Sequence, residues 1–412
     1  MGSSSISAGT SWGSGGAVAV VGGGVIGLSC AWRAASAGFT VTVYDPAPGS
    51  GASRVAGGML APVTEAVPGE QEVLALGAAA LRRWPDFAAE LASAGADPGL
   101  SVRGTLVVAV DPGDRAELDR LAEQLSRMGR RVEVLVGREV RRAEPSLGPQ
   151  VRRALSVPGD LSVDNRALLD ALLVACRRAG VVFCAQRCER LPAADVVVVA
   201  AGAHSAALHP VLHAVIRPVK GEILRLRARA GTLAPPSRTV RAIVGGRRPY
   251  LVPRPGGRMV LGATQRETGF DTDVTAGGVL ELLVDAERVL PALAEYVLEE
   301  TAAGLRPGSP DNLPVIGELE PGVLAATGHH RNGILLAPLT ADAIVALLRG
   351  DPVPPEVRSA APTRLTGAPV SGVVGYSTEC HSRGHQLGGV GWRGGLPGAP
   401  GHRAAAPLSR RR

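Results

Sequence analysis

The segment "TGHHRNGILLAP", residues 327–338, gathers residue types that could carry chemistry. Two adjacent histidines, an arginine and a turn-forming Asn-Gly pair precede an apolar run, which leaves open a metal site, a catalytic centre or the mouth of a cofactor pocket. Adjacent residues diverge by about 100° on a helix and face opposite sides of a strand, so His329 and His330 are poorly placed to grip one ion. Metal sites also use spaced ligands with acidic or cysteine partners, and none lies nearby. We therefore expect no metal here.

Arg331, Asn332 and Gly333 come immediately before this apolar helix. Backbone N–H groups at a helix start can face the electron-rich edge of a bound group, where negative charge develops during a reaction. Ile334 and Leu335 belong to the same first turn. The segment therefore favours the mouth of a cofactor pocket.

Two further residues could bind a carboxylate. Arg306 lies in "GLRPG", which we expect at the end of a helix on entry to a loop, and a guanidinium can hold a carboxylate through two parallel hydrogen bonds. The alternative for Arg306 is a surface ion pair. Tyr250 begins "YLVPR" in a chain with only four tyrosines and could add a donor, or could be an ordinary core aromatic.

The N-terminal part carries a nucleotide-binding pattern in residues 17–45. An apolar run is followed by Gly22, Gly24 and Gly27 in GxGxxG spacing, then by a helical segment that contains Val25 and Ile26, and by a second strand that ends in Asp45. Glycines allow a tight turn and close approach of a pyrophosphate, the helix start offers free N–H groups, and the carboxylate can accept hydrogen bonds from a ribose. These pieces in register predict a dinucleotide site.

The continuation favours FAD over NAD. Instead of further βα units, the small-residue stretch "GSGASRVAGGMLAP" (49–62) follows, which could lie against a large ligand. A buried-strand run, "ADVVVVAAGAHS" (194–205), then ends in another glycine turn at Gly202, like a distant strand returning to the same sheet.

Here the chain resembles the FAD-dependent amino-acid oxidase superfamily and, within it, the glycine oxidases of thiamine biosynthesis. The matching pieces, in family order over about residues 17–350, are "VVGGGVIGLSCAW", "GASRVAGGMLAP", "RPVKGE", "YLVPR", "LGAT", "AGLRPGSPDNLPVIG" and "GHHRNGILLAP".

The resemblance implies an α/β (α+β) fold with a discontinuous Rossmann-like FAD-binding domain and a mixed antiparallel-sheet substrate domain. The expected ranges are 17–85, 150–215 and 305–352 for the FAD domain, 86–149 and 216–304 for the substrate domain, a disordered N-terminus at 1–16 and a low-complexity basic tail at 353–412. Periodicity predicts helices near 74–95, 114–129, 165–180, 278–290 and 339–349, and strands near 104–110, 215–227, 240–254 and 258–264.

By resemblance, Arg306, Tyr250 and Arg331 bind the substrate, and FAD is held without a covalent bond. The expected cofactor contacts are Gly22, Gly24, Val25, Ile26, Gly27, Asp45, Ala52, Ser53, Gly57, Gly58, Met59, Cys188, Gly202, His329, His330, Asn332, Gly333, Ile334 and Leu335. Met59 and Gln265 are weaker candidates for pocket lining. Because flavin itself accepts the hydride, no side chain is expected to act as acid or base. The implied reaction takes glycine or a similar small amino acid and O2 to an imino acid and H2O2.

The charge distribution argues against a nucleic-acid face. Eight arginines against two glutamates after residue 352 supply +6 of the net +7, which leaves only +1 for the rest. The five cysteines show no CxxC spacing, the first 16 residues lack the features of a signal peptide, and no apolar run reaches about 18 residues. We expect a cytoplasmic enzyme with no membrane partner, and the family suggests a tetramer.

The family's usual hairpin between "RCERL" and "ADVVVV" is nearly absent, and Ala302 replaces a frequent aromatic. The alternatives are a sarcosine or D-amino-acid oxidase of the same superfamily, an inactive flavin-binding homologue, or a nucleic-acid binder acting through the tail.

Overall fold

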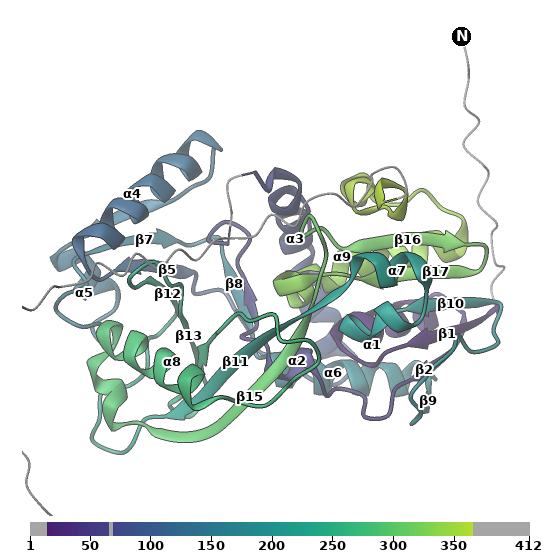
Figure 1. Ribbon diagram of the computed structural model, residues 1–412, viewed down its shortest axis with the longest axis horizontal. Coiled ribbons are helices and arrows are strands. Elements are labelled where there is room, and N and C mark those ends of the chain that lie inside the picture. The colour runs from purple at the N-terminus through teal and green to yellow at the C-terminus, as the bar shows by residue number, and fades with distance from the viewer. Residues whose placement is uncertain (1–14, 66–68, 366–412) are drawn as a thin grey trace, which may run out of the picture. The chain divides into compact units, whose positions relative to one another are not determined.

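A short apolar strand, β1 (Ala17–Val21), lies at the centre of a six-stranded sheet at the right of Figure 1. The computed structural model describes residues 15–65 and 69–365. The strand order is β16 (Val315–Glu320), β17 (Val323–Thr327), β10 (Val196–Val199), β1, β2 (Thr40–Tyr44) and β9 (Val182–Cys184). All neighbours are parallel except β16 and β17. The pairs β17–β10, β10–β1 and β2–β9 thus join segments that are far apart in the chain.

Four helices pack their apolar faces with this sheet into the largest core. They are α1 (Val25–Ser36), α3 (Gln71–Ser93), α6 (Asn165–Arg178) and α9 (Gly333–Arg349). Trp84 of α3 is fully buried, and its indole Nε1 donates to the carbonyl oxygen of Leu335 at 2.9 Å, which ties α3 to the start of α9. The stretch His330–Arg349 is long and apolar enough to cross a bilayer, but 61% of its apolar window is buried in the body, as in a core helix.

The second large sheet has eight strands and occupies the left and centre of Figure 1. Its order is β15 (Val297–Gly308), β11 (Arg217–Arg227), β14 (Arg258–Gly262), β13 (Tyr250–Arg254), β12 (Thr239–Ile243), β5 (Thr105–Ala109), β7 (Arg153–Val157) and β6 (Glu133–Val136). Only β5 and β12 pair in parallel, so the sheet is mixed but mostly antiparallel.

Smaller elements complete the body. The helices are α2 (Ala52–Val55), α4 (Pro112–Arg127), α5 (Arg138–Ala143), α7 (Pro210–Val215) and α8 (Ala276–Val289). The strands β3 (Met59–Leu60), β8 (Leu161–Val163) and β4 (Leu100–Ser101) form a three-stranded sheet. Short 3-10 helices cover Gly202–Ala207, Pro291–Glu295, His330–Asn332, Pro355–Ala360 and Pro362–Leu365.

The expected α/β architecture is confirmed, but one expected local structure is wrong. Arg306 does not end a helix: it lies within β15, which pairs with β11 along almost its whole length. The final helix also begins at Gly333, six residues before the expected position, and includes Pro338.

Three expected segment boundaries do not coincide with the sheets. β7 belongs to the eight-stranded sheet although 150–215 was expected in the FAD domain, and β15 extends past the expected boundary at 305. Helix α3 continues past residue 85, where Phe87 and Leu91 join the core of the six-stranded sheet.

The expected start of the tail at 353 is too early. Val357 and Ala360 are buried in the core, and Arg364 donates to both carboxylate oxygens of Asp311 at 2.8 and 3.2 Å. The chain therefore stays packed on the body through Leu365. The expectations for residues 1–14 and 366–412 lie outside the described residues.

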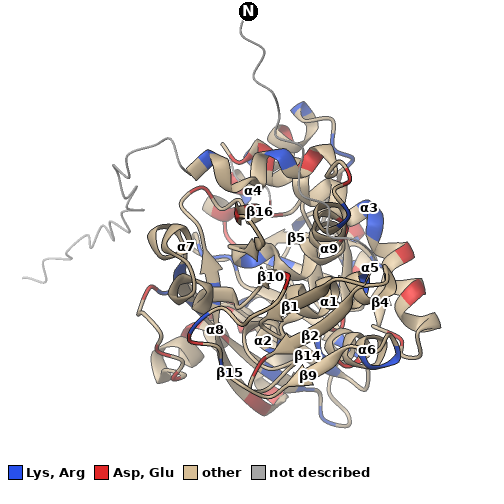
Figure 2. Ribbon diagram, turned by 90° about the vertical axis from the view of Figure 1, so that its right-hand side faces the viewer, with Lys and Arg blue, Asp and Glu red and all other residues tan. Residues whose placement is uncertain are grey.

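Basic and acidic residues are interspersed over the body in Figure 2, while the central strands β1 and β2 carry neither. Residues 366–412 contain six arginines and one glutamate, or +5 of the net +7. The described residues are therefore nearly balanced in charge.

Candidate active site

The turn between β1 and α1 can be built only with glycine at two positions. Gly22 has a φ of +110°, and a Cβ there would lie 2.4 Å from the carbonyl oxygen of Ala200. A Cβ on Gly27 would lie 1.8 Å from the carbonyl oxygen of Gly22, so α1 packs directly on the turn. Gly24 caps α1 without a side-chain hydrogen bond. The glycine spacing therefore brings a helix N-terminus close to a backbone turn, as an anion site requires.

Asp45 follows β2 and lies beside this turn. Its Oδ2 accepts from the backbone N of Gly23 at 2.7 Å, and its Oδ1 accepts from the backbone N of Ala47 at 2.8 Å. Each oxygen keeps a further lone pair for a hydroxyl donor. The structure thus holds the carboxylate where a ribose would be expected.

The carboxyl ends of β1, β2, β10 and β17 bring distant segments to one edge of the sheet. The N–H of Gly22 donates to the carbonyl oxygen of Tyr44 at 2.9 Å, and the N–H of Ala200 donates to that of Val21 at 2.8 Å. After β17, the hydroxyl of Thr327 donates to the carbonyl oxygen of Gly202 at 3.1 Å. Ligands of open α/β sheets bind at this edge.

The segment 51–59 joins this edge to the eight-stranded sheet. Ser53 Oγ accepts from the backbone N of Val25 at 3.0 Å, and Asn165 Nδ2 donates to the carbonyl oxygen of Ser53 at 2.9 Å. A Cβ on Gly58 would lie 2.1 Å from the carbonyl oxygen of Val163. Ala52 packs against β15, because a Cβ added to Gly304 would lie 3.1 Å from the Cα of Ala52. The expected small residues are therefore needed for close backbone approach.

The start of α9 reaches the same region. The side chain of its N-cap residue, Asn332, makes no capping hydrogen bond. The first N–H groups of the helix, those of Gly333, Ile334 and Leu335, are therefore not capped by it. His330 precedes them with a φ of +46°, and its ring Nδ1 is buried without a hydrogen-bond partner among the described residues. This arrangement offers donors to an electron-rich group, as the sequence predicts.

Neither histidine is set up as a base. His329 is 2% exposed, and its Nε2 lies 3.0 Å from Thr340 Oγ1. Burial lowers the pKa of His329 to about 3. For His330, burial and the positive charges of Arg306, Arg331 and Arg217 lower the pKa to about 3. Both rings are therefore neutral near pH 7, which fits a lining role.

Arg306 and Tyr250 come together from separate strands. A Cβ on Gly221 would lie 2.3 Å from Nη1 of Arg306, and a Cβ on Gly262 would lie 2.4 Å from Oη of Tyr250, so glycines make room for both side chains. The guanidinium donates to the carbonyl oxygen of Thr264 at 3.3 Å. No carboxylate among the described residues forms an ion pair with Arg306, which contradicts the alternative of a surface ion pair.

The electrostatics of this pair suit carboxylate binding. Burial raises the pKa of Tyr250, although the charge of Arg306 opposes the shift, so the phenol stays protonated and can donate. Burial lowers the pKa of Arg306, and the negative charge of Glu65 opposes that shift. Two donors thus converge with no internal acid bonded to them.

Arg331 forms ion pairs with two acids. Its Nη2 lies 3.4 Å from Oε2 of Glu70, and its Nε lies 3.7 Å from Oε2 of Glu65. Glu65 also forms an ion pair with Arg241, whose Nη1 lies 3.8 Å from Sδ of Met59. We define Glu65, Glu70, Arg241, Arg306 and Arg331 as the charge cluster.

Sequence reasoning missed three members of the charge cluster, Glu65, Glu70 and Arg241. One signal existed for Arg241, because a charged residue in the otherwise uncharged strand segment "TVRAI" needs a buried partner. No comparable signal marks Glu65 or Glu70, which lie in a loop and at a helix cap.

Two further predicted residues are Gln265 and Cys188. Gln265 is exposed to solvent. Cys188 packs in an apolar cluster with Tyr44 and Leu191, next to the end of β2. Burial raises the pKa of its thiol, with a smaller contribution from Cys184, so Cys188 behaves as packing rather than as a reactive group.

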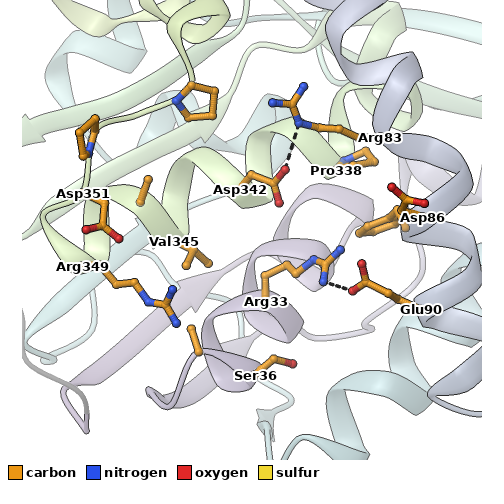
Figure 3. A pocket seen from close by; sticks show the side chains of 15 residues that line it. Arg33, Ser36, Arg83, Asp86, Glu90, Pro338, Asp342, Val345, Arg349 and Asp351 are labelled. Carbon is orange, nitrogen blue, oxygen red and sulfur yellow. Dashed lines mark hydrogen bonds and ion pairs between the residues drawn. The ribbon is translucent and has the colours of Figure 1, made fainter.

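A groove of about 600 Å³ lies elsewhere, between α1, α3 and α9 (Figure 3). Arg33 pairs with Glu90 across it, and Arg83 Nε lies 3.1 Å from Asp342 Oδ2. None of the predicted site residues lines this groove. It is a surface depression between paired charges, separate from the candidate site.

The profile of the FAD dependent oxidoreductase family matches residues 17–347. This chain belongs to the FAD-dependent oxidoreductase family. The glycine oxidase of Geobacillus kaustophilus is 34% identical over 78% of this chain and 90% of its own length. The putative thiamine biosynthesis oxidoreductase ThiO of Rhizobium etli is 36% identical over 83% of this chain and 99% of its own. The crystal structure of the G. kaustophilus glycine oxidase superimposes with a TM-score of 0.77, covering 85% of this chain and 99% of that one.

The residues present fit the cofactor of the FAD-dependent oxidoreductase family. The crowded turn at Gly22 and the uncapped start of α1 suit the pyrophosphate, and Asp45 suits the ribose. The uncapped start of α9 and the Nδ1 of His330, which has no partner within residues 15–65 and 69–365, leave donors and a polar atom for the flavin side of the site. The nucleotide side and the flavin side of FAD are thus each matched by a separate group of residues.

Proposed function

We propose that this protein oxidises glycine, or an amino acid of similar size, to the imino acid, with O2 as the final electron acceptor and H2O2 as the second product. The names of the relatives support this substrate class, and those named for thiamine biosynthesis support a role in supplying the imine to the thiazole of thiamine. The observation that carries the proposal is the buried Arg306 guanidinium, which forms no ion pair with an acid among the described residues and donates only to the carbonyl oxygen of Thr264 at 3.3 Å.

FAD supplies the hydride acceptor when it is bound, without a covalent link, and the rest of the mechanism is positioning by this chain. Arg306 would bind the substrate carboxylate with two parallel hydrogen bonds, and Tyr250 would donate a third. These contacts fix the Cα–H relative to the cofactor. Neither His329 nor His330 needs to transfer a proton, since the substrate reacts as its free amine.

The start of α9 would stabilise the electron-rich edge of the reduced cofactor. The N–H groups of Gly333, Ile334 and Leu335 lie at the positive end of this helix. Arg331 carries further positive charge next to this start, although its pairing with Glu65 and Glu70 makes it a less direct substrate ligand than the sequence suggests.

The test is turnover of glycine by the purified protein and by Arg306→Met. We expect a flavin absorbance spectrum for both, anaerobic bleaching by glycine for the wild type, and peroxide formation in air. The variant should lose about 100-fold or more in kcat/KM, because it leaves the substrate carboxylate without its charged partner. Wild-type turnover of sarcosine or D-alanine with none of glycine would redirect the substrate assignment, and unchanged turnover in Arg306→Met would contradict the site.

A further inference from the structure

The two glutamates of the charge cluster neutralise most of the positive charge of its three arginines. Arg241 and Arg331 each face a carboxylate, from Glu65 or Glu70, whereas Arg306 has no acidic partner among the described residues. Three positive charges against two negative ones leave a net +1. That remainder matches one carboxylate and no more.

Glu65 is the member that couples the other groups. Its side chain is 13% exposed, Oε1 bonds to Arg241, and Oε2 lies 3.7 Å from Nε of Arg331. Burial alone would raise the pKa of Glu65, but the charges of Arg241, Arg331 and Arg306 hold it below its usual value. Glu65 is therefore ionised, and its charge reaches Arg306.

We propose that Glu65 is a specificity-determining residue that restricts this site to amino acids with a single anionic group. The inference deepens the proposed function and rests on it. With Glu65 in place, a second carboxylate on the ligand would meet an anion and two arginines that already have partners. Without that charge, Arg241 would lose its ion-pair partner and could bind the second carboxylate, while Arg331 would keep Glu70.

The alternative role for Glu65 is purely structural, as an acid that keeps two arginines in place. The two roles differ in their effect on ligand charge. A structural role predicts that removal of the charge weakens every ligand alike. A specificity role predicts that it strengthens binding of a ligand with two negative charges far more than binding of a ligand with one.

The experiment measures binding of two inert probes, acetate and malonate, to the flavin-loaded full chain by calorimetry. Glu65→Gln keeps the shape and removes the charge, while Glu65→Asp keeps the charge. Glu117→Gln makes the same change in net charge at the surface pair with Arg248 and serves as the matched control. Malonate should bind Glu65→Gln at least about tenfold more tightly than it binds the wild type, Glu65→Asp or Glu117→Gln.

Arg241→Gln tests the same proposal by removing the positive partner of Glu65 instead of Glu65 itself. Its result does not depend on whether Glu65→Gln folds. Acetate should bind this variant at least about tenfold more weakly, because the unpaired Glu65 carboxylate would then oppose a carboxylate at Arg306. If the wild type binds neither probe, the proposed carboxylate site itself fails. If the wild type binds acetate but Glu65→Gln still rejects malonate, or Arg241→Gln binds acetate as well as the wild type, the specificity role of Glu65 is overturned.

Discussion

At the scale of single residues, the sequence pointed to the groups proposed to bind the substrate more readily than to the groups that balance their charge. Arg306 and Tyr250 could be predicted because they lie in short distinctive segments. Glu65 could not, and Arg241 could only through its charge within a strand, since Arg241 lies on β12 and Glu65 in a loop about 175 residues earlier, and only the folded chain brings them into contact. A residue whose role depends on a distant partner leaves little local signal.

Tyr250 offers a test of a single hydroxyl. Its ring is fixed between Gly57 and Gly262, where added Cβ atoms would lie 2.7 Å and 2.4 Å from Tyr250 atoms. Tyr250→Phe should therefore keep its position and lose one hydrogen bond to the substrate carboxylate, which raises KM for glycine about tenfold with little change in kcat.

Steady-state peroxide assays and thermal unfolding of Tyr250→Phe measure both effects. The melting temperature should stay close to that of the wild type because the packing is preserved. A fall in kcat without a change in KM would instead show that the phenol acts in the chemical step.

At the scale of elements, the amino-acid composition around Arg306 favours a helix, whereas strand pairing makes the segment a strand. The segment "LEETAAGLRPG" is rich in Ala, Glu and Leu, which favour a helix, yet it forms β15. Pairing with β11 satisfies its backbone along almost the whole strand, and this long-range contact outweighs local preference. By contrast, α1 and β1 were predictable because glycine spacing and apolar pattern agree there.

The contact between α1 and β1 gives a second prediction. Gly27→Ala would place a methyl group 1.8 Å from the carbonyl oxygen of Gly22, so the helix or the turn must shift. We expect a loss of about 1–3 kcal/mol or more in stability and weaker FAD binding. Fluorescence titration with FAD and chemical denaturation measure these changes.

Gly277→Ala is the matched control for this substitution. Gly277 also lies in a helix, α8, and an added Cβ there would meet no atom within 4 Å. Alanine should be neutral or should stabilise by about 0.5–1 kcal/mol. Equal effects of the two substitutions would show that crowding at Gly27 is not the cause.

At the scale of the whole molecule, the chain passes from the eight-stranded to the three-stranded sheet at Asp160, a fully buried carboxyl between β7 and β8. Oγ1 of Thr64 donates to its Oδ2 at 2.9 Å, one residue before Glu65. Burial raises the pKa of Asp160 to about 7, against the hydrogen bond from Thr64 and the charge of Arg241. The folded protein therefore keeps a proton that the unfolded chain releases near pH 4.

This difference makes stability depend on pH in a defined direction. The contribution of Asp160 is fully present below about pH 4 and is lost as pH rises through about 7, with a total on the order of 4 kcal/mol. Asp160→Asn cannot titrate and should remove this part of the decline. Denaturation of both proteins at pH 5 to 8 measures it, and parallel curves would contradict the assignment.

The boundaries between the two sheets were the least predictable feature at this scale. Strand β7 and the end of β15 are short pieces whose sheet is decided by neighbours far away in sequence. Periodicity indicates that a segment is a strand, but it does not indicate which sheet receives it. The packed segment 355–365 was missed for a related reason, since its few apolar residues lie among prolines and charges.

The position of β1 between β2 and β10, with β17 beyond, also has a consequence for synthesis on the ribosome. β2 is made within some 25 residues of β1, but β10 and β17 are made only after residues 196 and 323. Until residue 199 of 412 has been made, one side of β1 has no strand to pair with, and until β17 and α9 follow the nascent chain cannot enclose its cofactor. A prematurely terminated product that lacks β17 and α9 would therefore be an incomplete, aggregation-prone fragment instead of a smaller working enzyme.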